Sequence, residues 1–175
     1  MNRYLIFALC LIFLMIFFDR AYKVSKRKRN HNYKISAANK AFFKLRSFSG
    51  EFKHQQIITY LRKIDPYVFE ELVLTALEQS GYTIKRNHSY SGDGGSDGVC
   101  FLDGNKYILQ VKRYTNDISA AHLRDFEKLI QNKKVSGGLF VHTGRTSGRQ
   151  YANYKTTDLK IISGQRLIDL ILSTG

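Results

Sequence analysis

The sequence predicts an α/β fold, a mixed β-sheet flanked by helices, preceded by one N-terminal transmembrane helix. Segments with the alternation typical of strands are interleaved with segments of helical spacing. The 175 residues are 43% hydrophobic, with one proline and 13 glycines, which is typical of one ordinary folded domain with extensions. An uninterrupted apolar run near the N-terminus adds the expected membrane helix.

The apolar run, residues 4–18, predicts a membrane anchor over residues 1–22. At about 1.5 Å per residue it spans roughly 22 Å, short of the ~30 Å hydrocarbon core unless Arg3 and Arg20 reach outward to the interfaces. A cleaved signal peptide is the main alternative, but only Arg3 precedes the run and no small-residue cleavage motif follows it. Basic residues at 23–29 then predict a single-pass protein of the cell membrane with its C-terminal domain in the cytoplasm.

Positive charge is concentrated before the predicted domain. The formal net charge is +14. Residues 20–63 hold 13 Lys or Arg and one acid, whereas residues 64–175 are nearly balanced, with 14 Lys or Arg and 12 Asp or Glu. We therefore expect a basic linker over residues 23–63 and a folded domain over residues 64–175. The linker can bind anionic lipid or nucleic acid, or it can be a solvated spacer.

The folded domain is expected to begin with a helix that runs to residue 80. Asp65 at the N-cap and Pro66 at the first helical position form a strong start signal, and Gly81 follows the predicted end. Apolar residues at helical spacing form its core stripe. This spacing places Glu70 at the border of the stripe and Glu71 on the solvent side.

Five strands and three helices are expected after this first helix. The strands lie near residues 82–87, 97–102, 106–113, 137–143 and 159–163, and the helices near residues 119–133, 148–155 and 165–172. A Gly-rich loop at residues 91–95 precedes the second strand, and Asp103-Gly104-Asn105 predicts a tight hairpin turn after it. In the linker, residues 39–48 and 52–61 can form short helices within an otherwise irregular segment.

The third strand carries two polar side chains on one face. Gln110 and Lys112 alternate with Leu109 and Val111, so the amide and the ammonium lie roughly 7 Å apart. The preceding strand begins at Asp97, which can bring a carboxylate against Gln110. A carboxylate, an amide oxygen and the Val111 carbonyl form an all-oxygen ligand set suited to Mg²⁺ or Mn²⁺, and Lys112 could activate water or offset charge on a phosphate. The alternative is that these are ordinary surface residues of a hairpin.

Four short motifs occur along the predicted domain in a defined order. They are Asp65–Val73, Gly92–Val99, Gln110–Tyr114 and Gly138–Thr143. Together they resemble the Mrr-like branch of the PD-(D/E)xK nuclease superfamily. The resemblance covers about residues 64–172 and excludes the apolar run and the basic linker. It implies a restriction-endonuclease-like fold and a metal-dependent enzyme that hydrolyses DNA phosphodiester bonds.

The resemblance also implies roles for individual residues. Asp97 matches the metal-binding aspartate, Lys112 the catalytic lysine and Glu70 the acid on the helix. Gln110 stands where many relatives carry Glu, which lowers the negative charge of the site by one. Ser96 occupies a position that is often aliphatic, so the packing beside Asp97 can differ from that of relatives.

Other residues give weaker signals. Asp93 is better explained as a cap of the Gly-rich loop than as a catalytic acid. The segment Thr143–Ser147 resembles a phosphate-contacting loop, because Arg145 and several hydroxyls cluster before a helix, although an ordinary polar loop is an equal alternative. The remaining candidates lack the spacing of a metal site and receive no role: His88, His122, His142, Cys10 and Cys100.

We therefore expect a Mg²⁺-dependent endodeoxyribonuclease tethered to a membrane, with DNA and membrane lipid as partners. A catalytically weak module that tethers DNA at the membrane is one alternative, and a structure-selective junction nuclease with the same site chemistry is another. The presence of Asp97, Gln110 and Lys112 together favours an enzyme, because a degenerate site would have lost at least one of them. A homodimer is compatible with the sequence, which does not determine the oligomeric state.

Overall fold

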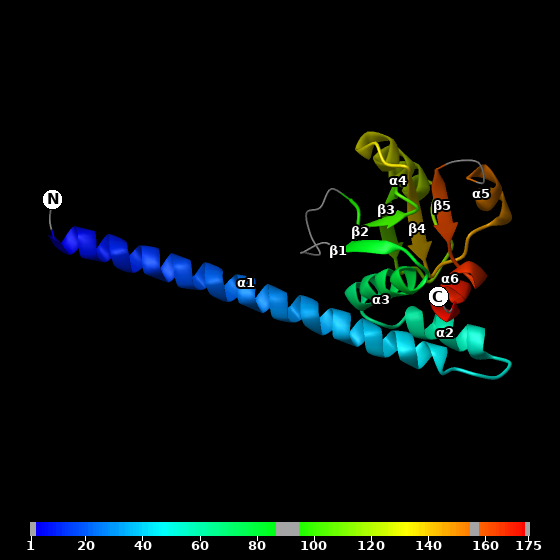
Figure 1. Ribbon diagram of the computed structural model, residues 1–175, viewed down its shortest axis with the longest axis horizontal. Helices are drawn as coiled ribbons and strands as arrows, with labels where there is room; N and C mark the ends of the chain where they lie inside the picture. The colour runs from blue at the N-terminus through cyan, green and yellow to red at the C-terminus, as the bar shows by residue number, and fades with distance from the viewer. Residues whose placement is uncertain (1–2, 87–94, 155–157, 174–175) are drawn as a thin grey trace. The chain divides into compact units, whose positions relative to one another are not determined.

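A five-stranded β-sheet forms the centre of the folded unit in the computed structural model (Figure 1). Its strands stand in sequence order: β1 (Thr83–Arg86), β2 (Gly98–Leu102), β3 (Asn105–Lys112), β4 (Gly137–His142) and β5 (Leu159–Ile162). β1, β2 and β3 pair antiparallel, whereas β3, β4 and β5 pair parallel. The predicted mixed sheet is confirmed.

The structure describes residues 3–86, 95–154 and 158–173, apart from the side chains of residues 3–10 and 27. Most of the predicted Gly-rich loop, including Asp93, lies outside the described residues. His88 lies outside them as well. The described helices are α1 (Arg3–Arg46), α2 (Lys53–Leu61), α3 (Pro66–Gln79), α4 (Ala120–Lys133), α5 (Gly148–Asn153) and α6 (Gln165–Leu172).

The helix start predicted at Asp65 and the helix expected near residue 119 are confirmed at the level of single hydrogen bonds. The Asp65 carboxylate accepts from the N–H groups of Tyr67 and Val68, at 2.9 and 3.1 Å, so it caps α3. The Ser119 hydroxyl accepts from the Ala121 N–H at 3.2 Å and caps α4. These caps satisfy donors that the first turn of a helix leaves unpaired.

Helices cover both faces of the sheet because its strands alternate two sets of apolar side chains. Leu109 and Val111 of β3 belong to one buried cluster, which also contains residues of α3 and α6. Ile108 belongs to the other cluster, which contains Phe126 and further residues of α4. All of β4 is buried, as expected for a parallel strand that is covered on both faces.

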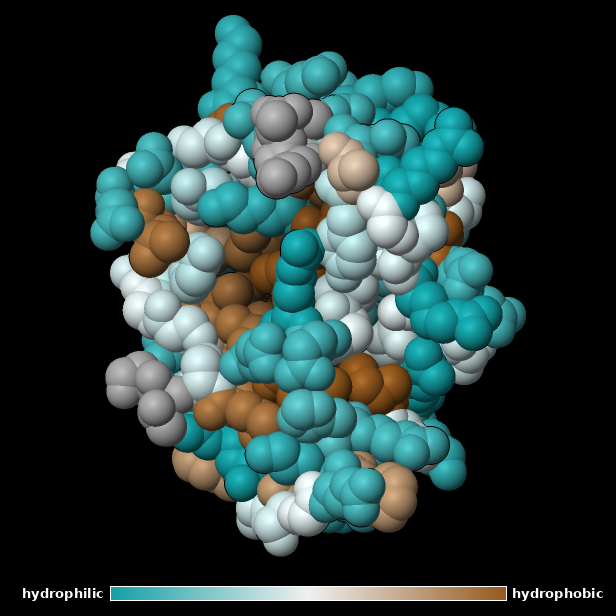
Figure 2. Space-filling model, turned by 90° about the vertical axis from the view of Figure 1, so that its right-hand side faces the viewer, coloured by the Kyte–Doolittle hydropathy of each residue, from teal (hydrophilic) through white to brown (hydrophobic). Residues whose placement is uncertain are grey.

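The side of the molecule on which α5, β5 and α6 lie in Figure 1 has an uneven surface. Figure 2 turns this side toward the viewer and shows apolar residues recessed between protruding hydrophilic side chains. Two cavities adjoin these elements. One, of about 360 Å³, is lined by both β5 and Tyr151, and the other, of about 470 Å³, lies where β4 and β5 end.

The folded unit begins earlier than the sequence predicts. The chain divides into two units, Met1–Tyr33 and Lys34–Gly175. Within the second unit, α2 confirms the short helix expected over residues 52–61, and the last part of α1 covers most of the one expected over residues 39–48. They supply buried apolar side chains to the core: Ala38, Ala41, Phe42, Leu45, Ile57 and Leu61. Residues 34–63 therefore pack as part of the fold and are not a solvated spacer.

The apolar run lies in the first unit, on α1. Its described residues, 11–18, are all exposed. None of the helices in the described part of the chain combines the length and the apolar character needed to cross a membrane. The anchor expected over residues 1–22 thus has no counterpart among them, and the side chains of residues 1–10 lie outside that description.

Glu71 is buried, which corrects the expectation that it faces solvent. Its exposed fraction is 2%, and its carboxylate accepts a hydrogen bond from Arg86 Nε at 3.2 Å. Arg86 also donates two hydrogen bonds to Glu78. The expectation failed because α3 is covered on more than its sheet side, and residues 71–77 are all buried.

Replacing Arg86 by Leu is expected to destabilise the fold, because it removes the cation beside the buried Glu71 carboxylate. Breaking one side of a buried ion pair costs on the order of 3 kcal/mol. Lys85→Leu removes the same charge from an exposed neighbour on β1 and should change the unfolding free energy by less than about 0.5 kcal/mol. Urea unfolding of the two variants checks this; equal stability of Arg86→Leu and the parent would contradict it.

Candidate functional site

Asp97 lies immediately before β2 and is bound to β3 through both its backbone and its side chain. Its N–H donates to the Leu109 carbonyl at 2.7 Å, and its carboxylate Oδ2 accepts from the Val111 N–H at 2.7 Å. The two bonds leave the carboxylate little freedom to rotate. Asp97 is therefore preorganised beside the C-terminal end of β3.

Gln110 and Lys112 are half-buried on β3, on the face opposite Leu109 and Val111, as the alternation predicts. The Gln110 amide donates from Nε2 to the Gly95 carbonyl at 3.1 Å, which leaves its amide oxygen without a hydrogen bond to any described residue. The Lys112 ammonium likewise has no hydrogen bond or ion pair within the described part of the chain. The Asp97 carboxylate accepts a hydrogen bond from the N–H of Val111, the residue that follows Gln110.

Glu70, on α3, lies close enough to this end of β3 for its charge state to depend on the groups there. Burial, and after it the negative charge of Asp97, raise the pKa of Glu70 from 4.5 to about 8, although the charge of Lys112 opposes the shift. Burial also raises the pKa of Asp97, against the lowering effects of the Val111 N–H and Lys112. Two carboxyl groups thus share a region that disfavours their ionised forms.

The structure therefore brings three of the predicted site residues together: Glu70, Asp97 and Lys112. Gln110 joins them through its place on β3, two residues before Lys112. Within the described residues, no group of three or more His, Cys, Asp or Glu side chains is placed to hold a metal. A cation at this position would need amide or carbonyl oxygens beside the carboxylates. The catalytic and metal-binding roles of Glu70, Asp97, Gln110 and Lys112 stay predictions.

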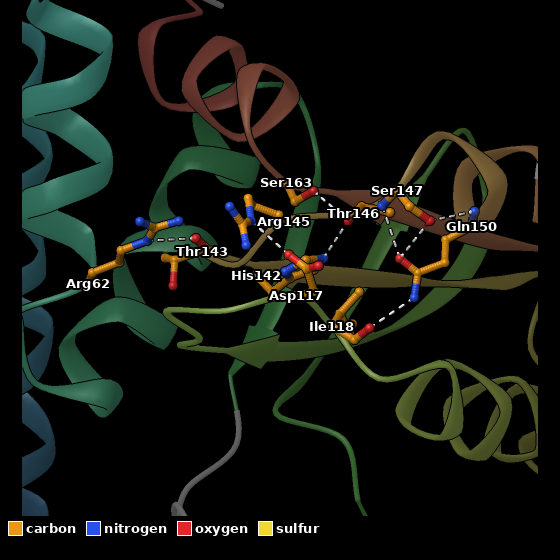
Figure 3. A network of polar contacts seen from close by, with 10 residues as sticks. All are labelled: Arg62, Asp117, Ile118, His142, Thr143, Arg145, Thr146, Ser147, Gln150 and Ser163. Atoms are coloured by element: carbon orange, nitrogen blue, oxygen red, sulfur yellow. Dashed lines mark hydrogen bonds and ion pairs between the residues drawn. The ribbon is translucent and has the colours of Figure 1, made fainter.

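A polar network ties the end of β4 to neighbouring segments (Figure 3). The Thr143 hydroxyl donates to the Tyr114 carbonyl at 2.7 Å and accepts from the Tyr114 N–H at 3.0 Å. Arg62, which follows α2, donates from Nε to the Thr143 carbonyl at 3.0 Å. Arg113 donates to the Ile64 carbonyl at 2.6 Å. The segments that follow β3 and β4 are thus fixed to each other and to the residues after α2.

The predicted phosphate-contacting loop, Thr143–Ser147, contains an ion pair that the sequence did not reveal. Arg145 Nε donates to the Asp117 carboxylate at 2.7 Å, and both side chains are largely exposed. Ser147 caps α5 through a capping box with Gln150. Asp117 could not be found from sequence, because it is 28 positions from Arg145 and no local pattern links them.

His142 is a buried member of this polar network. It is fully buried, and its Nε2 lies 2.9 Å from the Thr146 hydroxyl. Its Nδ1 has no hydrogen-bond partner among the described residues. Placing the ring proton on Nε2 avoids an unpaired buried donor, so Nε2 donates to Thr146. Burial lowers the pKa of His142 from 6.5 to about 4, so the ring is neutral at neutral pH.

Comparison with known proteins identifies the family of this chain. A family model described as "Restriction endonuclease" (Mrr_cat) matches residues 61–171, a range that holds every candidate site residue described above. The chain belongs to this family. The resemblance to Mrr-like restriction endonucleases is thereby confirmed.

Two individual proteins extend the comparison. The type IV methyl-directed restriction enzyme EcoKMrr of Escherichia coli (strain K12) is 30% identical over 125 residues, which are 67% of this chain and 41% of that enzyme. The DNA modification-dependent restriction endonuclease AspBHI aligns in structure with a TM-score of 0.56 and 17% identity, over 71% of this chain and 36% of that one. The second likeness shows the restriction-endonuclease-like fold. The chain spans less than half the length of either protein.

Lowering the pH is expected to destabilise the fold through His142. Because the pKa of His142 is depressed in the folded chain, the unfolded state binds the proton more readily below pH 6.5. The resulting stability is present above pH 6.5 and is lost as pH falls toward about 4, by about 3 kcal/mol. Glu70 titrates in the opposite sense, so the comparison must be between variants.

His142→Gln should show a smaller loss of unfolding free energy between pH 7 and pH 4.5 than the parent. Urea titrations of the parent and of the variant at the two pH values measure this difference. Identical pH dependence in the parent and His142→Gln would show that His142 does not contribute.

Proposed function

We propose that the chain is a metal-dependent endonuclease that hydrolyses phosphodiester bonds of DNA. The observation that carries this proposal is the meeting of Asp97, Glu70 and Lys112 at the C-terminal end of β3, with the Asp97 carboxylate held by the Val111 N–H. Membership of a restriction endonuclease family supports the reaction class. The names of the two relatives, both restriction enzymes that act according to methylation or modification of DNA, support DNA as the substrate.

The residues present fit a hard divalent cation, which is Mg²⁺ or Mn²⁺ in this proposal. One Asp97 oxygen is used by the Val111 N–H, which leaves the other for a ligand. The Gln110 amide oxygen and the Val111 carbonyl would complete a set made only of oxygen atoms. The raised pKa values of Glu70 and Asp97 mean that a positive charge at this place would stabilise their ionised forms.

A bound Mg²⁺ or Mn²⁺ would supply Lewis-acid stabilisation of the phosphate and activation of water. The protein's own groups would do the positioning. Lys112 is partly buried and has no anionic partner within 4.0 Å among the described residues, so its ammonium is available to a phosphate oxygen or to the attacking water. Glu70, with a pKa of about 8, holds a proton at neutral pH until a cation approaches. It can then accept a proton or bind water.

Two other functions remain as outcomes of the tests below. A catalytically weak module would bind DNA and cleave none under any metal. A structure-selective nuclease would cleave branched DNA faster than duplex DNA, through the same residues. The raised carboxyl pKa values favour an enzyme over a binding module, because a DNA-binding surface gains nothing from burying two acids beside each other.

We propose membrane attachment from the sequence. It rests on the apolar residues 11–18, which are exposed on α1, and on the basic residues that follow them. We propose a location at the cell membrane with the nuclease unit on the cytoplasmic side. A homodimer is a further proposal, which sedimentation of the purified chain would test.

Asp97→Asn and Lys112→Met should each lower the rate of plasmid nicking by a factor on the order of 10²–10³, because positioned charges act mainly on the transition state. DNA affinity should change little. Gln110→Glu should keep activity, and Glu70→Gln should reduce it. The measurement is nicking of supercoiled plasmid by the 175-residue chain with Mg²⁺, with Mn²⁺ and with EDTA.

Asp103→Asn and Lys106→Met are matched controls for this test. Both positions are exposed at the hairpin between β2 and β3, and asparagine tolerates the positive φ of residue 103. They should nick at the parental rate. Parental activity in Asp97→Asn would show that the site is misassigned, whereas an inactive parent with every metal would favour the binding module. Glu71→Gln is unsuitable as a neutral control because Glu71 is buried.

Replacing Lys26, Lys28 and Arg29 by Gln should weaken the salt dependence of DNA binding if this exposed basic stretch contacts phosphates. Each phosphate contact contributes a slope of about 0.9 in a plot of log affinity against log salt, so the slope should fall by up to about 3. Substitution is preferable to deletion, because residues 38–45 belong to the core.

The control for the basic stretch is a triple variant with the same charge change on the folded unit, Lys106→Gln, Arg124→Gln and Lys128→Gln. All three positions are exposed. Titrations with duplex DNA and with anionic liposomes separate the two polyanions. An unchanged slope with both would show that the stretch only separates other parts of the chain.

A further inference from the structure

A second cationic site lies at the C-terminal ends of β4 and β5. The cavity there has a volume of about 470 Å³. We call it the arginine pocket, and its polar lining includes Arg62, Arg145, Arg166, Thr146, Tyr151 and Ser163. None of the described residues that line it is acidic. Three guanidinium groups around one cavity make it a candidate site for an anion.

Two of these arginines are held in place by neutral groups. Arg62 uses Nε to bind the Thr143 carbonyl at 3.0 Å, which leaves the outer nitrogens of its guanidinium without a hydrogen bond to any described residue. Arg166 stacks on the Tyr151 ring at 4.2 Å and makes one long bond of 3.5 Å to the Ile161 carbonyl. Neither forms an ion pair within the described residues. Their charges are therefore oriented but not neutralised.

Hydroxyl groups line the same pocket. Ser163 Oγ lies 2.8 Å from Thr146 Oγ1 and 2.7 Å from the Tyr151 hydroxyl. The chain of hydroxyls begins at the buried His142, whose Nε2 lies 2.9 Å from Thr146 Oγ1 (Figure 3). The two mutual hydrogen bonds use two of the three hydroxyl protons, so this chain leaves one proton for an oxygen anion in the pocket. Guanidinium and hydroxyl donors together are typical of contacts to phosphate oxygens.

The pocket shares a sheet edge with the proposed catalytic groups. Lys112 pairs with His142, and Val141 pairs with Ile162, in the parallel part of the sheet. The ends of β3, β4 and β5 therefore open on the same edge. Neighbouring strands are about 4.8 Å apart, so the pocket lies one to two strand spacings, roughly 5–10 Å, from Lys112 along that edge. A DNA strand carries one phosphate per about 3.4 Å of helix axis, so such a distance corresponds to up to about three nucleotides.

We propose that the arginine pocket binds a backbone phosphate of the DNA substrate, within about three nucleotides of the scissile bond, and so sets the position of the strand on Lys112 and Asp97. This inference rests on the proposed nuclease function for its substrate. Arg62 and Arg166 are positioning residues in it. Arg145 contributes less, because Asp117 already pairs with its charge.

The test uses the 175-residue chain with Asp97→Asn, in EDTA, so that binding is measured without cleavage. Arg62→Gln combined with Arg166→Gln should lower the affinity for a fluorescent duplex by roughly tenfold and reduce the salt slope by about one to two. Arg124→Gln, at an exposed position on α4 outside the pocket, should leave both unchanged. Unchanged affinity and slope in a folded double variant would overturn the proposal.

A second measurement covers the case in which the double variant fails to fold. In the chain without pocket substitutions, the ¹H–¹⁵N signals of Arg62 Nε and Arg166 Nε should shift on addition of the duplex, while that of Arg124 Nε should not. Inorganic phosphate at equal phosphate concentration should give much smaller shifts. If phosphate alone reproduces the shifts and the duplex does not, the pocket is a small-anion site and the proposal fails.

The two proposals fail separately. An inactive parent whose pocket variants still lose affinity and salt slope would refute the nuclease and keep the phosphate contact. An active parent whose pocket variants bind and nick DNA at the parental level would refute the phosphate contact and keep the nuclease. In the active case, the double variant should also nick more slowly at DNA concentrations below its Kd.

Discussion

The register of β3 is the constraint on which the rest of this structure depends. β3 pairs antiparallel with β2 on one side, where the residues are buried or half-buried, and parallel with β4 on the other, where every residue is buried. A slip of one residue would exchange Gln110 and Lys112 with Leu109 and Val111, placing two polar groups in the core. The Asp97 hydrogen bonds to Leu109 and Val111 add a further restraint at the point where the proposed chemistry occurs.

The two neighbouring glutamates on α3 show how stability and chemistry are separated in this fold. Glu71 is deeper, yet it lies beside Arg86, so its charge is compensated. Glu70 is less buried but faces Asp97, and its raised pKa means that ionising it in the folded chain costs free energy. A fold selected only for stability would not place a carboxyl group there, so the cost is best explained by a cation or substrate that enters the site.

How much of this could be predicted from the sequence differs between local and long-range features. The strands, the hairpin turn, the cap at Asp65 and the helix near residues 119–133 follow from short-range sequence patterns, and they are confirmed. Periodicity could not show that α3 is also covered on its second side by α1, α2 and α6, because the partners are distant in sequence. For the same reason, the sequence did not reveal the Glu71–Arg86 and Asp117–Arg145 ion pairs. It also did not show that the basic segment, residues 23–63, contains core residues.

The mixed topology explains why so many charged groups converge on one edge of the sheet. Because β2 runs antiparallel to β3, the start of β2, with Asp97 before it, lies at the edge where β3 ends. Because β4 and β5 run parallel to β3, their ends lie at that edge as well. A carboxylate that precedes one strand, a lysine that ends the next and the arginine pocket beyond the last two therefore form one row. In a purely parallel sheet Asp97 would lie at the opposite edge, and in a purely antiparallel one the ends of β3 and β4 could not meet. The antiparallel hairpin thus supplies the acid, and the parallel pairing brings Lys112 and the arginine pocket to the same edge, where the proposed path of the phosphate backbone requires cations.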